Sequence, residues 1–105
     1  MQTKIENAGI VLKANVYFAG KVVSHTIENK DGSKQSVGII YPGTYSFNTG
    51  APERMDIIAG ACKVRIKGAS DWTAYAAGAF FEVPAKLSFE ITVDSGITEY
   101  LCTYK

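Results

Sequence analysis

The chemistry open to this chain is limited by its single histidine, His25. A transition-metal site built on imidazoles needs at least two of them on neighbouring strands. A site made from Cys62, Cys102 and His25 is conceivable, but no Cys-x-x-Cys or His-x-His spacing supports it. We therefore expect His25 to be a surface or partly buried side chain, and we expect no metal and no other cofactor.

Nucleophilic catalysis is not indicated by the sequence either. A cysteine nucleophile would need His25 beside Cys62 or Cys102, and nothing in the sequence orients such a pair. The Gly-x-Ser-x-Gly, Walker A and Gly-x-Gly-x-x-Gly patterns do not occur in the chain. Phosphate chemistry built on a glycine-rich loop is therefore not predicted.

Two stretches carry a more specific pattern. Six residues separate Glu53 from Gly60, and five residues separate Gly78 from Pro84. This spacing resembles the two sequence motifs of the cupins, whose metal-binding members add three histidines to the glutamate. The residues at those histidine positions are Phe47, Thr49 and Phe89. The chain therefore resembles a cupin that lacks the three imidazoles and keeps the carboxylate.

The order of short motifs along the chain resembles the pyrimidine/purine nucleoside phosphorylase family, whose members are small single-domain cupins. The matching segments are 17–22, 36–38, 43–47, 52–55, 71–72, 78–84 and 100–104. The Tyr-Leu-Cys-x-Tyr ending is the most distinctive of them. Because the resemblance begins near Asn15, residues 15–105 are predicted to form the cupin domain and residues 1–14 an N-terminal extension.

This resemblance implies phosphate-dependent cleavage of a broad set of purine and pyrimidine nucleosides, giving a free base and a pentose 1-phosphate. The expected partners are therefore nucleosides and inorganic phosphate. The resemblance also implies a homodimer of cupin barrels without a required metal.

Glu53 is the predicted catalytic residue, since the motif alignment places it on the inward face of its strand. A carboxylate there can accept hydrogen bonds from sugar hydroxyls and favour the positive charge that develops on the sugar ring. The alternative is a surface glutamate at the start of a strand after Pro52.

The predicted substrate-binding residues are Tyr45, Phe47, Thr49, Phe89, Tyr100 and Tyr104. Phe47 and Phe89 are either core residues or a stacking floor for the base. Phosphate needs positive charge or a cluster of N–H groups, so Lys21 and Arg54 are the predicted phosphate-binding residues. The alternative for both cations is solvated surface charge.

These residues must be positioned by β-strands, because the dominant pattern along the chain has a period of two. It is clearest in residues 61–67 and 87–93, where apolar and polar side chains alternate. Further strands are expected at 16–18, 21–27, 36–41, 44–49, 54–59, 79–83 and 97–104.

Turn-forming residues separate the expected strands at 29–32, 42–43, 59–61 and 94–96. At most one helical turn is expected, near residues 1–7 or 52–55. Many short strands at regular spacing predict an all-β, single-domain fold. We expect a cupin-like antiparallel β-barrel, which is a double-stranded β-helix or jelly roll, with a cavity lined by alternate residues of each strand.

The composition excludes several partners. The 105 residues carry a formal net charge of +1 at pH 7, which argues against nucleic acid or an acidic membrane surface as partner. Two cysteines 40 residues apart favour reduced thiols. There is neither a membrane-length apolar run nor a signal-peptide core, so a cytoplasmic location is expected.

Two other functions compete with phosphorolysis. One is a non-catalytic, cupin-like protein that binds a sugar or nucleoside. The other is a sugar-modifying cupin enzyme of isomerase type, which the missing histidines make less favourable. Phosphate-dependent turnover distinguishes the first hypothesis from both.

Overall fold

The computed structural model describes residues 2–105, and its strands confirm the predicted all-β class. The elements, in chain order, are Gly9–Ile10 (β1), Asn15–Tyr17 (β2), the 3₁₀ turn Phe18–Gly20 (η1), Val22–Glu28 (β3), Lys34–Ile40 (β4), Gly43–Asn48 (β5), Glu53–Ala59 (β6), Ala61–Ile66 (β7), Thr73–Ala76 (β8), Phe80–Val83 (β9), Ser88–Val93 (β10) and Thr98–Tyr104 (β11).

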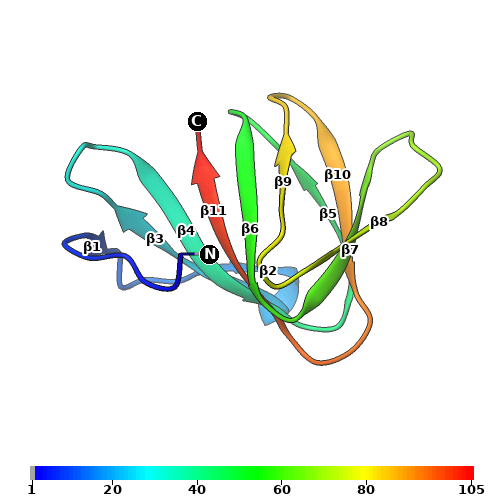
Figure 1. The fold of residues 1–105 in the computed structure, drawn as a ribbon, viewed down its shortest axis with the longest axis horizontal. Coiled ribbons are helices and arrows are strands. Elements are labelled where there is room, and N and C mark those ends of the chain that lie inside the picture. Colours follow the sequence, from blue (N-terminus) through cyan, green and yellow to red (C-terminus); the bar gives the residue numbers. More distant parts are fainter. Residues whose placement is uncertain (1) are drawn as a thin grey trace.

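The strands form two antiparallel sheets, as Figure 1 shows. The larger sheet has the order β1-β3-β4-β11-β6-β9, with β2 also paired to β3, and the smaller has the order β5-β10-β7-β8. Within residues 2–105 the pairings stay inside each sheet, which is the arrangement of a two-sheet jelly roll. The cupin-like fold is thus confirmed, while closure into one continuous barrel stays a prediction.

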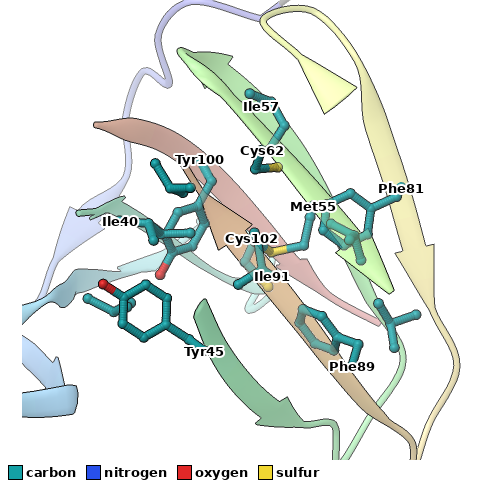
Figure 2. Close-up of a cluster of buried hydrophobic side chains, with 14 residues drawn as sticks. Ile40, Tyr45, Met55, Ile57, Cys62, Phe81, Phe89, Ile91, Tyr100 and Cys102 are labelled. Carbon is teal, nitrogen blue, oxygen red and sulfur yellow. The ribbon is translucent and has the colours of Figure 1, made fainter. Parts of the chain in front are cut away.

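The core lies between the two sheets because alternate residues of each strand point inward. Met55 of β6 and Cys102 of β11 are buried on the inner face of the larger sheet. Phe89 and Ile91 of β10 are buried on the smaller sheet, and Figure 2 shows these four side chains gathered in the interior. Of these strands, β10 buries the face that the period-two pattern predicted.

The predicted turn at residues 29–32 is confirmed as the tip of the β3–β4 hairpin. The Asn29 N–H donates to the Ser33 carbonyl oxygen at 2.9 Å, and Gly32 has a φ of 87°. Asp31 Oδ1 accepts a hydrogen bond from the Ser33 N–H at 2.9 Å. Glycine is favoured at this tip because positive φ costs it nothing.

The predicted helical turn does not occur at either expected place within the described chain, since residues 2–6 have no regular secondary structure, Asn7 is in a bend with a φ of 58°, and Glu53 begins β6. A 3₁₀ turn forms instead at η1, where Phe18 and Ala19 have φ values of 51° and 56°. Strands β1 and β8 were not predicted, because one is two residues long and the other is Thr-Ala-Tyr-Ala, with little apolar alternation. No helix within residues 2–105 has the length and apolar character needed to span a bilayer.

The N-terminal segment packs on the outer face of the larger sheet. Residues 2–5 line a hollow of about 240 Å³ together with Val37, Ile58 and Leu101, and the Val11 N–H donates to the Thr26 carbonyl oxygen at 2.9 Å. Leu101 is 5% exposed at the base of this hollow although it points away from the core between the sheets. The division into an extension and a domain at residue 15 stays a prediction.

Gly38 lets three central strands approach closely, because it lies in β4 between β3 and β11. A Cβ at this position would lie 2.5 Å from the Val23 carbonyl oxygen and 2.8 Å from Ser24 Cβ. We expect Gly38→Ala to lower the free energy of unfolding by roughly 1–3 kcal/mol, since backbone would have to move to relieve the overlap. Urea denaturation measures the change.

Gly50→Ala is the matched control, because a Cβ at Gly50 meets nothing within 4 Å. It should change the free energy of unfolding by no more than about 0.5 kcal/mol. Equal stability of the two variants would contradict the close strand approach at Gly38.

Candidate active site

A cavity of about 160 Å³ lies between the two sheets and is lined by side chains from both. Its inner part is formed by buried residues such as Tyr100 and Cys102. Its rim includes Tyr17 and Tyr104, which are 46% and 42% exposed. The cavity therefore reaches from the core to the surface and has room for a small ligand at its mouth.

Glu53 lines this cavity from the first position of β6. Its carboxylate is half-buried, and Cys102 Sγ–H donates to Glu53 Oε1 at 3.5 Å. Burial raises the pKa of Glu53 above its usual value, and the hydrogen bond from Cys102 partly opposes that change. Glu53 is the one charged side chain among the described residues that line the cavity.

An aromatic pair forms another wall of the cavity. Phe47 of β5 and Phe89 of β10 are cross-strand partners whose rings stack with centroids 5.7 Å apart and planes 26° apart. Tyr17 and Phe18 meet the Phe47 ring edge-on, at 6.2 and 5.5 Å. Two of the three histidine positions of a metal-binding cupin thus hold a packed aromatic surface.

Hydroxyl groups line the part of the cavity formed by the larger sheet. Ser36 and Tyr104 share a hydrogen bond of 2.9 Å between their hydroxyl oxygens. Burial raises the pKa of Tyr100 and of Tyr104 to about 12 each, and the Ser24 and Ser36 side chains respectively oppose the change in part. Both phenols therefore stay protonated at neutral pH and can act as hydrogen-bond donors.

Tyr45 and Thr49 are not among the residues that line the cavity. The Tyr45 hydroxyl donates to the carbonyl oxygens of Tyr41 and Pro42, each at 2.9 Å. Thr49 Oγ1 donates to the Pro84 carbonyl oxygen at 2.6 Å and accepts from the Leu87 N–H at 3.0 Å. Both hydroxyls are hydrogen-bonded to backbone atoms, so these two side chains stabilise the fold around their strand.

Lys21 and Arg54 also lie outside the cavity lining. Lys21 is exposed next to η1. Arg54 follows Glu53 on β6, so its side chain emerges on the opposite face of the sheet. There its guanidinium lies 3.9 Å from the centre of the Phe80 ring and bonds to Asp56 Oδ1 at 3.2 Å. Neither predicted phosphate-binding cation is brought to Glu53.

Several polar cavity residues were not predicted from the sequence, namely Tyr17, Ser24, Ser36 and Asn48. The sequence could have identified Ser24 and Ser36 as cavity residues, because each occupies an inward position in step with buried apolar residues of its strand. A serine that is 3% exposed at such a position indicates a polar wall. Tyr17 lies in a three-residue strand too short to show alternation.

Within residues 2–105, the side chains of histidine, cysteine, aspartate and glutamate form no group of three that could hold a metal ion. His25 is half-buried on β3, where its Nδ1 lies 3.1 Å from the Val11 carbonyl oxygen. Both cysteines are buried and free.

Comparison with known sequences identifies close relatives. The sequence profile of the pyrimidine/purine nucleoside phosphorylase family matches residues 12–104. A pyrimidine/purine nucleoside phosphorylase of Thiobacillus denitrificans is 52% identical over 102 residues, covering 97% of this chain and 98% of that protein. One from Herminiimonas arsenicoxydans is 50% identical and covers 99% of both chains.

Solved structures support the same grouping. A protein of unknown function from an Acinetobacter species superposes with a TM-score of 0.93 at 36% identity, covering 97% of this chain and 98% of that one. A protein of unknown function from Vibrio parahaemolyticus gives 0.83 at 46% identity, covering 93% and 100%. The EutQ protein of Clostridium difficile, at 14% identity and a TM-score of 0.67, shares the fold alone. The profile match and the near-complete overlap with both relatives show that this chain belongs to the pyrimidine/purine nucleoside phosphorylase family.

Proposed function

We propose that this chain is a broad-specificity nucleoside phosphorylase, which cleaves purine and pyrimidine nucleosides with inorganic phosphate to a free base and a pentose 1-phosphate. Membership of the family supports this activity. The observation that carries the proposal for the site is the position of Glu53, a half-buried carboxylate in a cavity whose other walls are aromatic rings and hydroxyls.

Glu53 is the proposed catalytic residue. Its oxygens can accept hydrogen bonds from the 2′- and 3′-hydroxyls of the pentose, which fixes the sugar above the cavity floor. As the bond to the base breaks, positive charge develops on the sugar ring. The carboxylate attracts that charge more strongly than it attracts the neutral ground state, so it favours the transition state.

Phe47 and Phe89 are proposed to hold the base. Every nucleobase has a π-face, so stacking on an aromatic surface accepts purines and pyrimidines alike. The edge-on contacts of Tyr17 and Phe18 hold the Phe47 ring in position. This arrangement supports a broad substrate range, because ring stacking does not read the edge of the base.

The reaction balances without any further reagent. The electron pair of the bond between C1′ and the base nitrogen leaves with the base, and a lone pair of a phosphate oxygen forms the new bond to C1′. The proton of hydrogen phosphate ends on the departing base. The chain's part is to bind, orient and stabilise charge, which is consistent with a cavity that contains no histidine among its described lining.

The proposal is tested by incubating the purified protein with uridine or inosine, with and without phosphate. Release of the base that requires phosphate, with one pentose 1-phosphate formed per base, is the expected result. Equal release without phosphate would make the protein a hydrolase. Measurable nucleoside binding without turnover would favour a binding protein.

The acid side of the pH–rate profile should depend on Cys102. The reactive form of Glu53 is the carboxylate, so kcat/KM should fall as the pH drops through the raised pKa of this residue. The hydrogen bond from Cys102 lowers that pKa, so Cys102→Ala should move the acid limb to higher pH. Cys62→Ala removes a buried thiol outside the cavity and should leave the limb in place. Coincident profiles for both variants would contradict the coupling.

We further propose that the protein acts in the cytoplasm as a homodimer. Two buried, free cysteines fit a reducing compartment. Exposed apolar side chains such as Val16 and Phe80 offer surface for a second copy. Sedimentation equilibrium at micromolar concentration tests the dimer, and a single monomeric species would exclude it.

A further inference from the structure

The reaction requires phosphate, yet the cavity supplies no cation to bind it. The side chains of residues 2–105 that line it include no lysine and no arginine. Arg54 is on the other face of β6, engaged by Phe80 and Asp56, and Lys21 is at the surface. The anion must therefore be held by neutral donors or by groups outside the cavity.

Neutral donors are concentrated on one wall. We define the hydroxyl wall as Ser24, Ser36, Tyr100 and Tyr104, which belong to the neighbouring strands β3, β4 and β11. Ser24 and Ser36 are each 3% exposed and Tyr100 is 7% exposed, within a core that is otherwise apolar. Their concentration beside the cavity gives this wall the donors and acceptors that a polar ligand requires.

These hydroxyls keep protons free for a ligand. In the pair formed by Ser36 and Tyr104, one hydroxyl donates to the other at 2.9 Å, so the second proton remains available. Ser24 Oγ accepts from Asn15 Nδ2 at 3.3 Å, and the Ser24 side chain also forms a hydrogen bond with the Tyr100 hydroxyl. One proton of the Ser24–Tyr100 pair is used in that bond, so the pair supplies one further donor for a ligand.

We propose that the hydroxyl wall is the phosphate-binding subsite of this enzyme, an inference that rests on the proposed function. Glu53 is suited to bind the sugar, and the ring pair Phe47 and Phe89 is suited to bind the base. The hydroxyl wall is then the part of the cavity left for phosphate, the third reactant. Ser24 and Tyr100 lie at one level of the sheet and Ser36 at the next, two residues further along each strand, roughly 7 Å away. An anion with several acceptor oxygens can bridge donors at this spacing.

The absence of a cation at this subsite has a catalytic consequence. Bound phosphate and Glu53 are two negative groups in one partly buried cavity, with no lysine or arginine among the described lining to neutralise either. Their repulsion is relieved when positive charge develops on the sugar between them. The subsite therefore stabilises the transition state more than the bound reactants, and ground-state phosphate binding should be weak.

Tyr104→Phe and Ser36→Ala test the inference in the full chain, with KM for phosphate and KM for uridine measured separately. Each should raise KM for phosphate by about tenfold, the usual scale of a hydrogen bond to a charged group, and leave KM for uridine within about twofold. Tyr41→Phe and Ser46→Ala remove exposed hydroxyls outside the cavity and are the matched controls. Tyr104 is itself 42% exposed, so its variant should fold normally.

Phosphorus NMR titration of inorganic phosphate gives a readout that does not need turnover, and Tyr104→Phe should weaken that binding by a similar factor. A change in KM for uridine alone would place the sugar on this wall and overturn the inference. Unchanged phosphate binding, or a rise in KM for phosphate in Lys21→Ala or Arg54→Ala, would overturn it as well. If the wild-type protein shows no phosphate-dependent turnover, the proposed function fails instead.

Discussion

Replacing Glu53 with glutamine is expected to lower kcat/KM for phosphorolysis by at least about 100-fold, the scale of losing one preorganised electrostatic contact. Glutamine has nearly the same shape and keeps an oxygen that can accept from Cys102, so the loss isolates the negative charge. Most of the loss should appear in kcat, since the charge acts when the sugar becomes cationic.

The same substitution should not weaken the fold. The pKa of Glu53 is raised in the folded chain, so protonation favours folding, and that advantage is lost as the pH rises through this pKa. At neutral pH the glutamine variant should therefore unfold at the same urea concentration as the wild type or a higher one. Glu82→Gln on the neighbouring strand β9 is the control for both measurements. Full activity of Glu53→Gln would show that another group carries the reaction.

Phe47→Ala should raise KM for the nucleoside by roughly 5- to 150-fold, because stacking of a base on an aromatic ring contributes about 1–3 kcal/mol. The factor should be similar for uridine and inosine, since both bases stack on the same ring. KM for phosphate should change little. Steady-state kinetics with each nucleoside measures all three values.

Two further variants separate stacking from packing. Phe47→Leu keeps apolar volume and loses the π-face, so it should reproduce most of the rise in KM while retaining more stability than Phe47→Ala. Phe80→Ala removes a 49% exposed ring from the outer face of the larger sheet and should leave KM for the nucleoside unchanged. A normal KM for uridine in Phe47→Leu would mean that this ring serves the core alone.

The buried face of a strand could be predicted from the sequence where the opposite face is exposed to solvent. Residues 61–67 and 87–93 alternate cleanly, and β7 and β10 bury the predicted faces. Glu53 and Phe89 were found through motif spacing, and both line the cavity. The local sequence was therefore enough to predict the inward faces of β7 and β10 and two residues of the cavity lining.

The local sequence did not predict which hydrogen-bond partner each polar side chain would have. Tyr45 and Thr49 lie on strand β5 or just after it, yet their hydroxyls bond to backbone carbonyls that only the folded chain brings near. Arg54 is one residue from Glu53, but the alternation of a strand puts it on the other face. The hydroxyl wall joins residues 24 and 36 to residues 100 and 104, so it depends on long-range pairing.

The most direct test of the account is a crystal structure of the protein with a bound pentose 1-phosphate. Glu53 is predicted to accept hydrogen bonds from the 2′- and 3′-hydroxyls, with the phosphate group against Ser36 and Tyr104. A sugar bound elsewhere, or a Glu53 side chain turned out into bulk water in that complex, would contradict the assignment of this cavity as the active site.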